Sequence, residues 1–130
     1  MKNVIKYAVL ATVFCGTAMA QEAPEMYKQT YPDYALGPAM DLLGALEGDQ
    51  SAIDFKTMQL IQLGVSAQIP CTYCVYYHTR AAKAAGATPD EIKAAVAAAA
   101  DTRMWSTVLN GNAYDMEAFK AEVDSLVPLN

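Results

Sequence analysis

The chain has 130 residues, of which 9 are Lys or Arg and 14 are Asp or Glu, so its formal net charge is −5. This length suits a single domain, and an acidic chain without a basic run argues against nucleic acid or an anionic membrane as a partner. Alanine accounts for 24 residues, and because alanine favours helices we expect an all-α fold.

Residues 1–20 have the features of a secretory signal peptide. Two lysines precede an apolar stretch over residues 7–14, and Ala18 and Ala20 are small residues at the positions that a signal peptidase reads. The apolar stretch is short for a membrane span, which favours cleavage. We therefore expect the mature chain to begin at Gln21 and to be free of the membrane.

Cleavage would leave residues 21–130 as one helical domain. It removes two lysines and no acid, so the 110 remaining residues carry a net charge of −7. Cys71 and Cys74 are then the only cysteines, and export places them in an oxidising compartment, which we expect to be a bacterial periplasm. Cys15 leaves a lipoprotein alternative open, although bulky Phe14 just before it is a poor match to a lipidation site.

The sequence predicts a compact bundle of about six short helices. Residues 21–35, with two prolines and three tyrosines, are typical of an extended lead-in. A short helix should follow Pro38 and end near Gly48. The next helix should run from about Asp54 to Ala67, where apolar residues recur at helical spacing.

The centre of the chain carries the clearest start and stop signals. A helix from about Cys71 to Ala85 should follow the break at Pro70 and end at Gly86, a typical C-terminal cap. Residues 88–91, Thr-Pro-Asp-Glu, form a capping box with proline at the first helical position.

The capping box should begin an Ala-rich helix from Pro89 to Ala100, which can approach a neighbouring backbone closely. A separate amphipathic helix is expected around residues 104–109, before the turn at 110–112. The last helix should carry apolar residues at i, i+3, i+7 and i+10, namely Met116, Phe119, Val123 and Leu126.

Residues able to do chemistry are concentrated between positions 71 and 78. On a helix, Cys71, Cys74 and His78 fall at i, i+3 and i+7, which places them on one face. Free backbone N–H groups and the helix dipole stabilise a thiolate in the first turn. His78 lies one turn beyond Cys74 and could exchange a proton with it directly or through one water.

A reactive thiol, a second thiol and a nearby base make a dithiol redox centre. Such a centre can reduce a peroxide through a sulfenic acid, or exchange disulfides with a small thiol or a protein. Two other interpretations remain open at this point. The pair could form a structural disulfide, or it could bind zinc together with His78, although a fourth ligand is missing. Val75 stands where covalent haem attachment would need a histidine. We expect no metal and no cofactor.

The motif and its surroundings resemble a known family. The stretch Cys71-x-x-Cys74-x-x-x-His78, followed by Gly-Ala-Thr-Pro-Asp-Glu-Ile at 86–92, is similar to the carboxymuconolactone decarboxylase/alkylhydroperoxidase D-like family. The resemblance implies an all-helical fold, homo-oligomers (often trimers or hexamers) and peroxidase-type thiol chemistry. It also implies that Cys74, paired with His78, is the peroxidatic thiol and Cys71 the resolving one, whereas the helix-terminus argument alone favours Cys71 as nucleophile.

Gln59 departs from the family pattern. The family places a Glu twelve residues before the first Cys, where it orients the His and takes up its proton. Gln59 can hydrogen-bond there but cannot accept a proton. Without the resemblance, Gln59 would be taken for a solvent-facing polar residue of its helix.

The sequence therefore predicts an exported thiol-dependent oxidoreductase of the peroxidase or disulfide-exchange type. Its substrate would be a peroxide or a small disulfide, and its electron donor an unidentified thiol. Two alternatives are a non-catalytic oligomeric module with a structural disulfide, and a lactone decarboxylase. The latter would need cationic groups near its pocket, for which the candidates are Lys56, Arg80, Lys83, Lys93 and Arg103.

Overall fold

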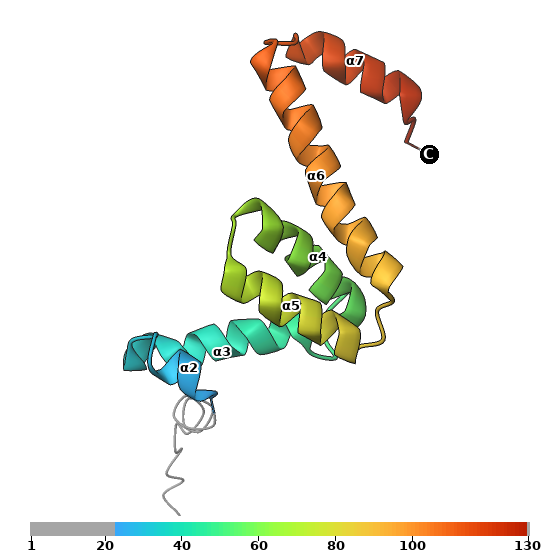
Figure 1. Cartoon of the computed structure of the whole chain (residues 1–130). Coiled ribbons are helices and arrows are strands. Elements are labelled where there is room, and N and C mark those ends of the chain that lie inside the picture. Colours follow the sequence, from blue (N-terminus) through green and yellow to red (C-terminus); the bar gives the residue numbers. More distant parts are fainter. Residues whose placement is uncertain (1–22, 130) are drawn as a thin grey trace, which may run out of the picture. The chain divides into compact units, whose positions relative to one another are not determined.

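The computed structural model describes residues 23–129 (Figure 1). The chain divides into two units, over residues 1–52 and 53–130. Between residues 23 and 129 the chain forms helices joined by turns and contains no strand, which confirms the expected all-α fold. The predicted signal peptide lies outside the described residues. No helix within the described part of the chain combines the length and apolar character needed to cross a membrane.

The described part of the first unit consists of α2 (Glu25–Lys28) and α3 (Asp33–Glu47), which contact each other. The expected extended lead-in over residues 21–35 is therefore wrong, as is a helix beginning only after Pro38. Pro38 lies inside α3. Proline disfavours a helical conformation in the preceding residue through clashes with that residue's backbone N–H and Cβ, and Gly37 lacks the Cβ.

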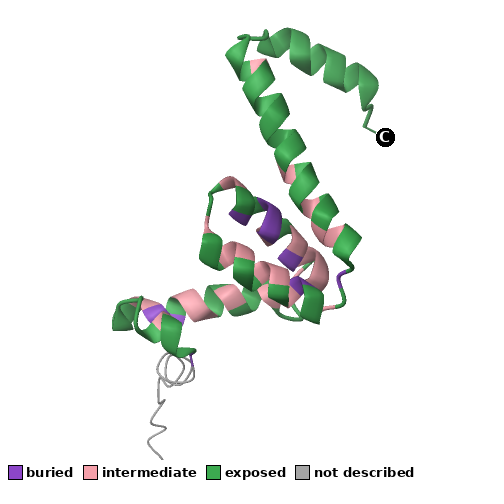
Figure 2. Ribbon diagram, in the orientation of Figure 1, coloured by how far each residue is buried: buried purple, intermediate pink, exposed green. Residues whose placement is uncertain are grey.

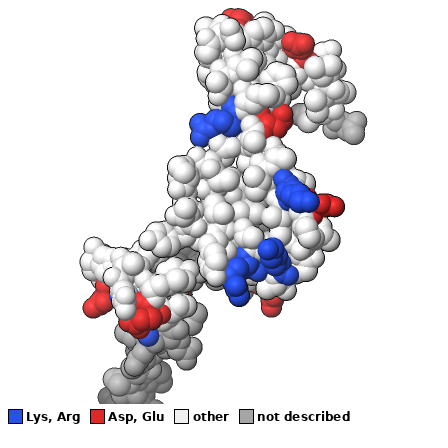
Figure 3. Space-filling model, viewed as in Figure 1, with Lys and Arg blue, Asp and Glu red and all other residues white. Residues whose placement is uncertain are grey.

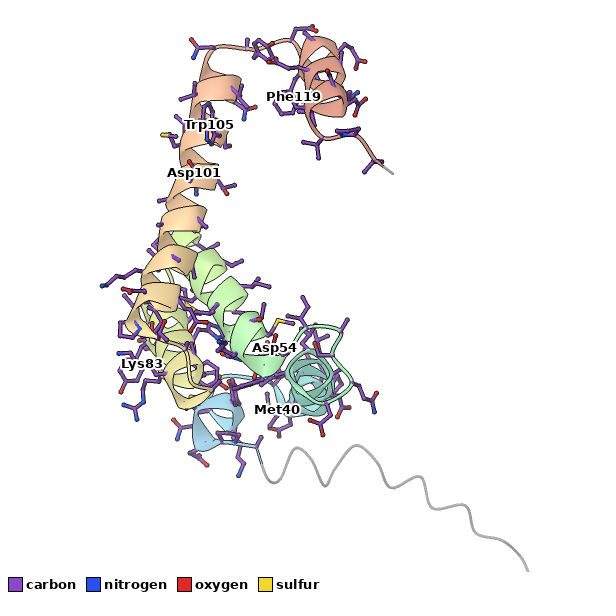
Figure 4. The ribbon with its side chains drawn as sticks, turned by 90° about the vertical axis from the view of Figure 1, so that its right-hand side faces the viewer. Met40, Asp54, Lys83, Asp101, Trp105 and Phe119 are labelled. Carbon is purple, nitrogen blue, oxygen red and sulfur yellow. A yellow bond between two sulfur atoms is a disulfide. The ribbon has the colours of Figure 1, made fainter. Side chains whose placement is uncertain are left out.

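The second unit begins with two helices that follow the sequence prediction closely. Helix α4 (Phe55–Gln68) is capped by Asp54, whose carboxylate accepts the Thr57 backbone N–H at 3.0 Å; Figure 4 labels Asp54 at the start of α4. Helix α5 (Thr72–Ala84) ends before Gly86. Gly86 has a φ of +84°, a left-handed conformation that a residue without a Cβ adopts at little cost.

Helix α6 (Pro89–Gly111) begins at the predicted capping box, in which Thr88 and Glu91 exchange both hydrogen bonds. The expected division into helices at 89–100 and 104–109 is wrong, because α6 is continuous. No Gly or Pro interrupts the sequence between those segments, so each new residue adds a helical hydrogen bond at little cost. Helix α7 (Met116–Leu126) matches the predicted last helix.

Helix α4 contacts both α5 and α6, so the core of the second unit lies along it (Figure 2). Leu63 and Ser66 of α4 and Ala82 of α5 are buried. On the side facing α6, a Cβ built on Gly64 would lie 3.4 Å from the Ala95 carbonyl oxygen and 3.5 Å from the Ala99 Cβ. Small residues on both helices therefore allow the close approach expected of the Ala-rich segment.

Polar contacts join α4 to α6 at both ends of this seam. Near the start of α6, the Lys56 Nζ and a Glu91 Oε1 form an ion pair at 2.7 Å. Further along, Arg103 donates from Nε to the Gln68 side-chain oxygen at 2.7 Å, and the Gln68 amide nitrogen donates to the Ala99 carbonyl. These directional bonds set the register of two helices whose small apolar side chains define it weakly.

Helices α6 and α7 keep large apolar side chains on their surface. None of their residues, all of which the structure describes, is buried. Figure 4 labels two of the aromatic side chains, Trp105 on α6 and Phe119 on α7. The exposed large apolar residues of this pair of helices include Met104, Trp105, Val108, Met116, Phe119, Val123 and Leu126. Among the described residues of the second unit, these apolar side chains remain exposed.

Candidate active site

The loop between α4 and α5 places both cysteines at the start of α5. The backbone N–H of Cys71 donates to the Ser66 carbonyl at 3.1 Å, which ties the loop to the end of α4. Cys71 is the N-cap of α5 rather than part of its first turn, and its Sγ accepts the Cys74 backbone N–H at 3.2 Å. A sulfur in this position receives an N–H group and faces the positive end of the helix dipole.

Cys71 and Cys74 are joined by a disulfide, with their Cα atoms 5.3 Å apart. Both residues are partly exposed, and the bridge closes a loop of only three residues along the chain. A bridge over so short a loop removes little entropy from the unfolded chain, so it contributes little as a staple. The two residues predicted to form a redox-active pair are thus close enough to form a disulfide, and this bridge adds little to the stability of the fold.

His78 lies one turn further along α5 and is held from α4. Its Nδ1 lies 2.8 Å from the Gln59 Oε1. With the amide oriented in this way its oxygen can only accept, so Nδ1 carries the hydrogen and Nε2 is the basic nitrogen of the neutral ring. The Tyr77 ring meets the imidazole edge to face, with centroids 5.1 Å apart. The arrangement fixes both the tautomer and the orientation of His78.

Gln59 is fully buried, at 0% exposure, and with Leu63 it has one of the largest fully buried side chains among the described residues. The solvent-facing position expected from spacing alone is therefore wrong: α5 crosses α4 over this face and excludes water. The Gln59 amide nitrogen has no hydrogen-bond partner among the described residues. A buried amide that leaves one of its polar atoms without a hydrogen bond lowers the stability of the fold. The other polar atom of Gln59, its oxygen, forms the hydrogen bond that orients His78.

A hollow of about 570 Å³ opens beside the disulfide. Cys71 lines it, whereas Cys74 and His78 do not. The hollow is bordered by the α4–α5 loop and by one stripe of α5, with lining residues Ala67, Pro70, Cys71, Thr72, Val75, Tyr76, Thr79, Arg80 and Lys83. One cysteine of the pair, Cys71, thus borders a cavity large enough for a small molecule.

Two cations in this hollow, Arg80 and Lys83, were considered from sequence only as candidates for a lactone site. They belong to a stripe at helical spacing that starts at Thr72 and passes through Tyr76 and Thr79. That periodicity is the signal that could have placed them beside the cysteine. The other three cations considered for a lactone pocket do not line this hollow. Lys56 pairs with Glu91, Lys93 pairs with Asp90, and Arg103 donates to Gln68.

Among the described residues, no three His, Cys, Asp or Glu side chains are grouped so that they could hold a metal ion.

Residues 35–115, more than half of the chain, match the model of the Carboxymuconolactone decarboxylase family. The chain belongs to this family. The match runs from α3 to the turn before α7 and includes Cys71, Cys74, His78 and Gln59. No significant match was found among curated proteins or among solved structures. Membership of the carboxymuconolactone decarboxylase family, a helical family, agrees with the helices described above.

Proposed function

We propose that this carboxymuconolactone decarboxylase family member is an exported thiol-dependent oxidoreductase, whose Cys71–Cys74 pair cycles between dithiol and disulfide. The observation that carries the proposal is the bond between His78 and the buried Gln59, formed beside a disulfide that adds little as a staple. A merely structural bridge requires no histidine one turn away with a defined tautomer. A thiol that must gain and lose a proton does.

In the peroxidase form of this activity, Cys74 is the nucleophile because it lies one helical turn before His78. Its thiolate attacks one peroxide oxygen, the O–O bond breaks, and the departing oxygen takes up a proton to leave as alcohol or water. Cys74 becomes a sulfenic acid. The Cys71 sulfur then attacks the Cys74 sulfur, the S–O bond breaks, water leaves, and the disulfide forms. The two thiols thus supply the two electrons that reduce the peroxide.

His78 moves the protons of this cycle. Its Nε2 takes the proton from the Cys74 thiol and returns it to the departing oxygen. Gln59 is a positioning residue, since it touches neither sulfur through any described contact and acts by orienting the imidazole. The same dithiol can instead pass its electrons to a small disulfide, with thiolate as the leaving group in place of alkoxide.

Trapping of the sulfenic acid tests the proposal and the roles of the two cysteines. Reduced protein is treated with one equivalent of hydrogen peroxide and dimedone, and the modified peptide is identified by mass. We expect Cys71→Ser to accumulate the adduct on Cys74. We expect Cys74→Ser to form none while its helical circular dichroism stays unchanged, because the swap replaces one atom. An adduct on Cys71 in Cys74→Ser would reverse the roles, and no adduct in either variant would overturn the peroxidase form.

We further propose that the protein acts in the periplasm as a homo-oligomer, a trimer or a hexamer. The signal-peptide features of residues 1–20 support export. The exposed apolar side chains of α6 and α7 support association, because covering them with a second copy removes apolar area from water.

A further inference from the structure

The hollow beside Cys71 carries positive charge in an acidic protein. Arg80 and Lys83 line it, and none of the described residues that line it is Asp or Glu. The chain as a whole has a formal net charge of −5. In Figure 3, Lys and Arg side chains gather over the C-terminal half of α5, where these are the only two cations, and Figure 4 labels Lys83 on that helix. The hollow therefore differs in sign from the molecule around it.

Neither cation is neutralised by a carboxylate of the described residues. The three ion pairs within the described part of the chain use Lys56, Lys93 and Lys120. The Arg80 guanidinium instead lies over the Tyr76 ring, 5.8 Å from its centroid, which holds the charge at the wall of the hollow without cancelling it. Two hydroxyl groups, on Thr72 and Thr79, also line the hollow and can donate hydrogen bonds. The lining is suited to an anion.

The hollow also selects one sulfur. Thiol–disulfide exchange requires the incoming sulfur to approach one sulfur of the bridge while the other leaves. Because Cys71 lines the hollow and Cys74 does not, a thiol entering there reaches Cys71 first, and its attack on the Cys71 Sγ would make Cys74 the leaving group. Cys74 lies one turn before His78, whose Nε2 can take up a proton and pass it to the leaving sulfur. The direction of attack therefore matches the position of the proton-transfer group.

We propose that the electron donor is a small thiol that carries a carboxylate, drawn into the hollow by the positive charge of Arg80 and Lys83. This inference rests on the proposed function in one respect, the reducibility of the disulfide. The donor thiolate attacks the Cys71 Sγ, the S–S bond breaks, and Cys74 leaves and is protonated. A second donor thiolate then attacks the donor sulfur of the mixed disulfide, releases Cys71, which takes up a proton, and forms the donor disulfide. Two thiols are oxidised and the protein disulfide is reduced to the dithiol.

Reduction of the oxidised protein by three thiols of similar size tests this inference. The thiols are 3-mercaptopropionate, 2-mercaptoethanol and cysteamine, which carry a negative, a zero and a positive charge. No peroxide is present, samples are quenched with acid, and the free thiols at Cys71 and Cys74 are alkylated and counted by mass. The rate constant of the Arg80→Gln/Lys83→Gln variant is divided by that of the wild type for each thiol. This ratio cancels the different intrinsic reactivities of the three thiols.

We expect this ratio of rate constants to be about one fifth for 3-mercaptopropionate, near one for 2-mercaptoethanol and above one for cysteamine. Fivefold is the scale of two charges acting across several ångströms of water at low salt, and added salt should shrink it. The swap Arg80→Lys/Lys83→Arg keeps both charges and should behave as the wild type. Lys93→Gln/Lys120→Gln removes two cations outside the hollow and should leave all three ratios near one.

Ratios that are equal for the three thiols would overturn the inference and leave the proposed function intact. The same holds if the control variant that lacks Lys93 and Lys120 reproduces the whole effect, since net charge would then suffice. Rapid reduction by an acidic dithiol protein, with no charge preference among the small thiols, would assign the hollow to a protein partner instead. A bridge that resists all three thiols would overturn the proposed function and this inference together.

Discussion

At the scale of single residues, Gln59 is the position where burial and chemistry meet. The side chain is fully buried, its oxygen accepts from His78 at 2.8 Å, and its amide nitrogen has no partner among the described residues. A carboxylate in its place would pair with the His78 imidazolium and stabilise it. Gln59 offers only a neutral acceptor, so it orients the ring without storing a proton.

We predict that Gln59→Glu lowers the apparent pKa of the reactive thiol by about one unit, because the added charge stabilises an imidazolium–thiolate pair. The measurement is the pH profile of alkylation of the reduced protein. Gln59→Met serves as the matched variant: it keeps the size but removes the acceptor, and it should slow alkylation near neutral pH. Superimposed profiles for wild type and Gln59→Glu, with the variant folded, would show that position 59 has no influence on the thiol.

At the scale of helices, the second unit depends on how α4 meets α6. Small side chains bring these helices close at Gly64, and the Lys56–Glu91 ion pair links them near the start of α6. Glu91 also completes the capping box with Thr88, so one carboxylate serves two structures. Hydrogen bonding from Lys56, followed by that from Thr88, holds the pKa of the Glu91 carboxyl below its ordinary value of 4.5. The pKa of Lys56 is raised above 10.5, chiefly by its hydrogen bond to Glu91.

These directions fix the pH range in which the pair stabilises the fold. The contribution of the Glu91 carboxylate to folding stability is complete above its unfolded-state pKa of 4.5. It is lost as the pH falls through the lowered pKa that Glu91 has in the folded protein. The contribution of the Lys56 ammonium group to folding stability is complete below its unfolded-state pKa of 10.5. It is lost as the pH rises through the raised pKa that Lys56 has in the folded protein. We predict that Lys56→Met, which leaves the capping box in place, lowers the urea midpoint at neutral pH.

The difference in urea midpoint between wild type and Lys56→Met should shrink as the pH falls from about 6 to about 3, because the wild-type pair is then lost as well. Thr88→Ala is the matched control, since it removes a cap hydroxyl that does not titrate in this range. A difference that is the same at both pH values would show that the ion pair contributes nothing to stability.

At the scale of the whole molecule, the exposed apolar side chains of α6 and α7 are the observation that supports the proposed homo-oligomer. We predict that the molar mass of the purified protein, measured by light scattering, is that of a trimer or a hexamer. Val123→Glu, on the apolar face of α7, should reduce that mass. Ser125→Glu adds the same charge on the opposite face of the helix and should leave the mass unchanged. A wild-type monomer at micromolar concentration would contradict the prediction.

Export is the second prediction at this scale. Protein recovered from its native host should begin at Gln21, because the residues before it match the site that a signal peptidase reads. Sequencing of the N-terminus by mass spectrometry gives the answer directly. An intact Met1 on protein from the cytoplasm would contradict export, and lipid attached to Cys15 would place the protein on a membrane.

What the sequence determined by itself is local. Asp54, the capping box at Thr88 and the left-handed Gly86 mark helix ends through bonds that span three or four residues, and these ends lie where they were predicted. The register of the cysteines and His78 on α5 is equally local, since it follows from 3.6 residues per turn. Two predicted helix boundaries were wrong. Pro38 was expected to precede a helix but lies inside α3, and a helix end was expected after Ala100, where no Gly or Pro interrupts α6.

Only the tertiary structure decided which of these residues meet. Gln59 and His78 are 19 residues apart, and their bond exists because α5 packs on the face of α4 that carries Gln59. Spacing along α4 cannot tell a buried Gln59 from an exposed one, because burial depends on the helix packed against it. The hollow that Arg80 and Lys83 share with Cys71 has the same origin: the α4–α5 loop closes one side of the hollow, and that closure depends on how two separate helices pack.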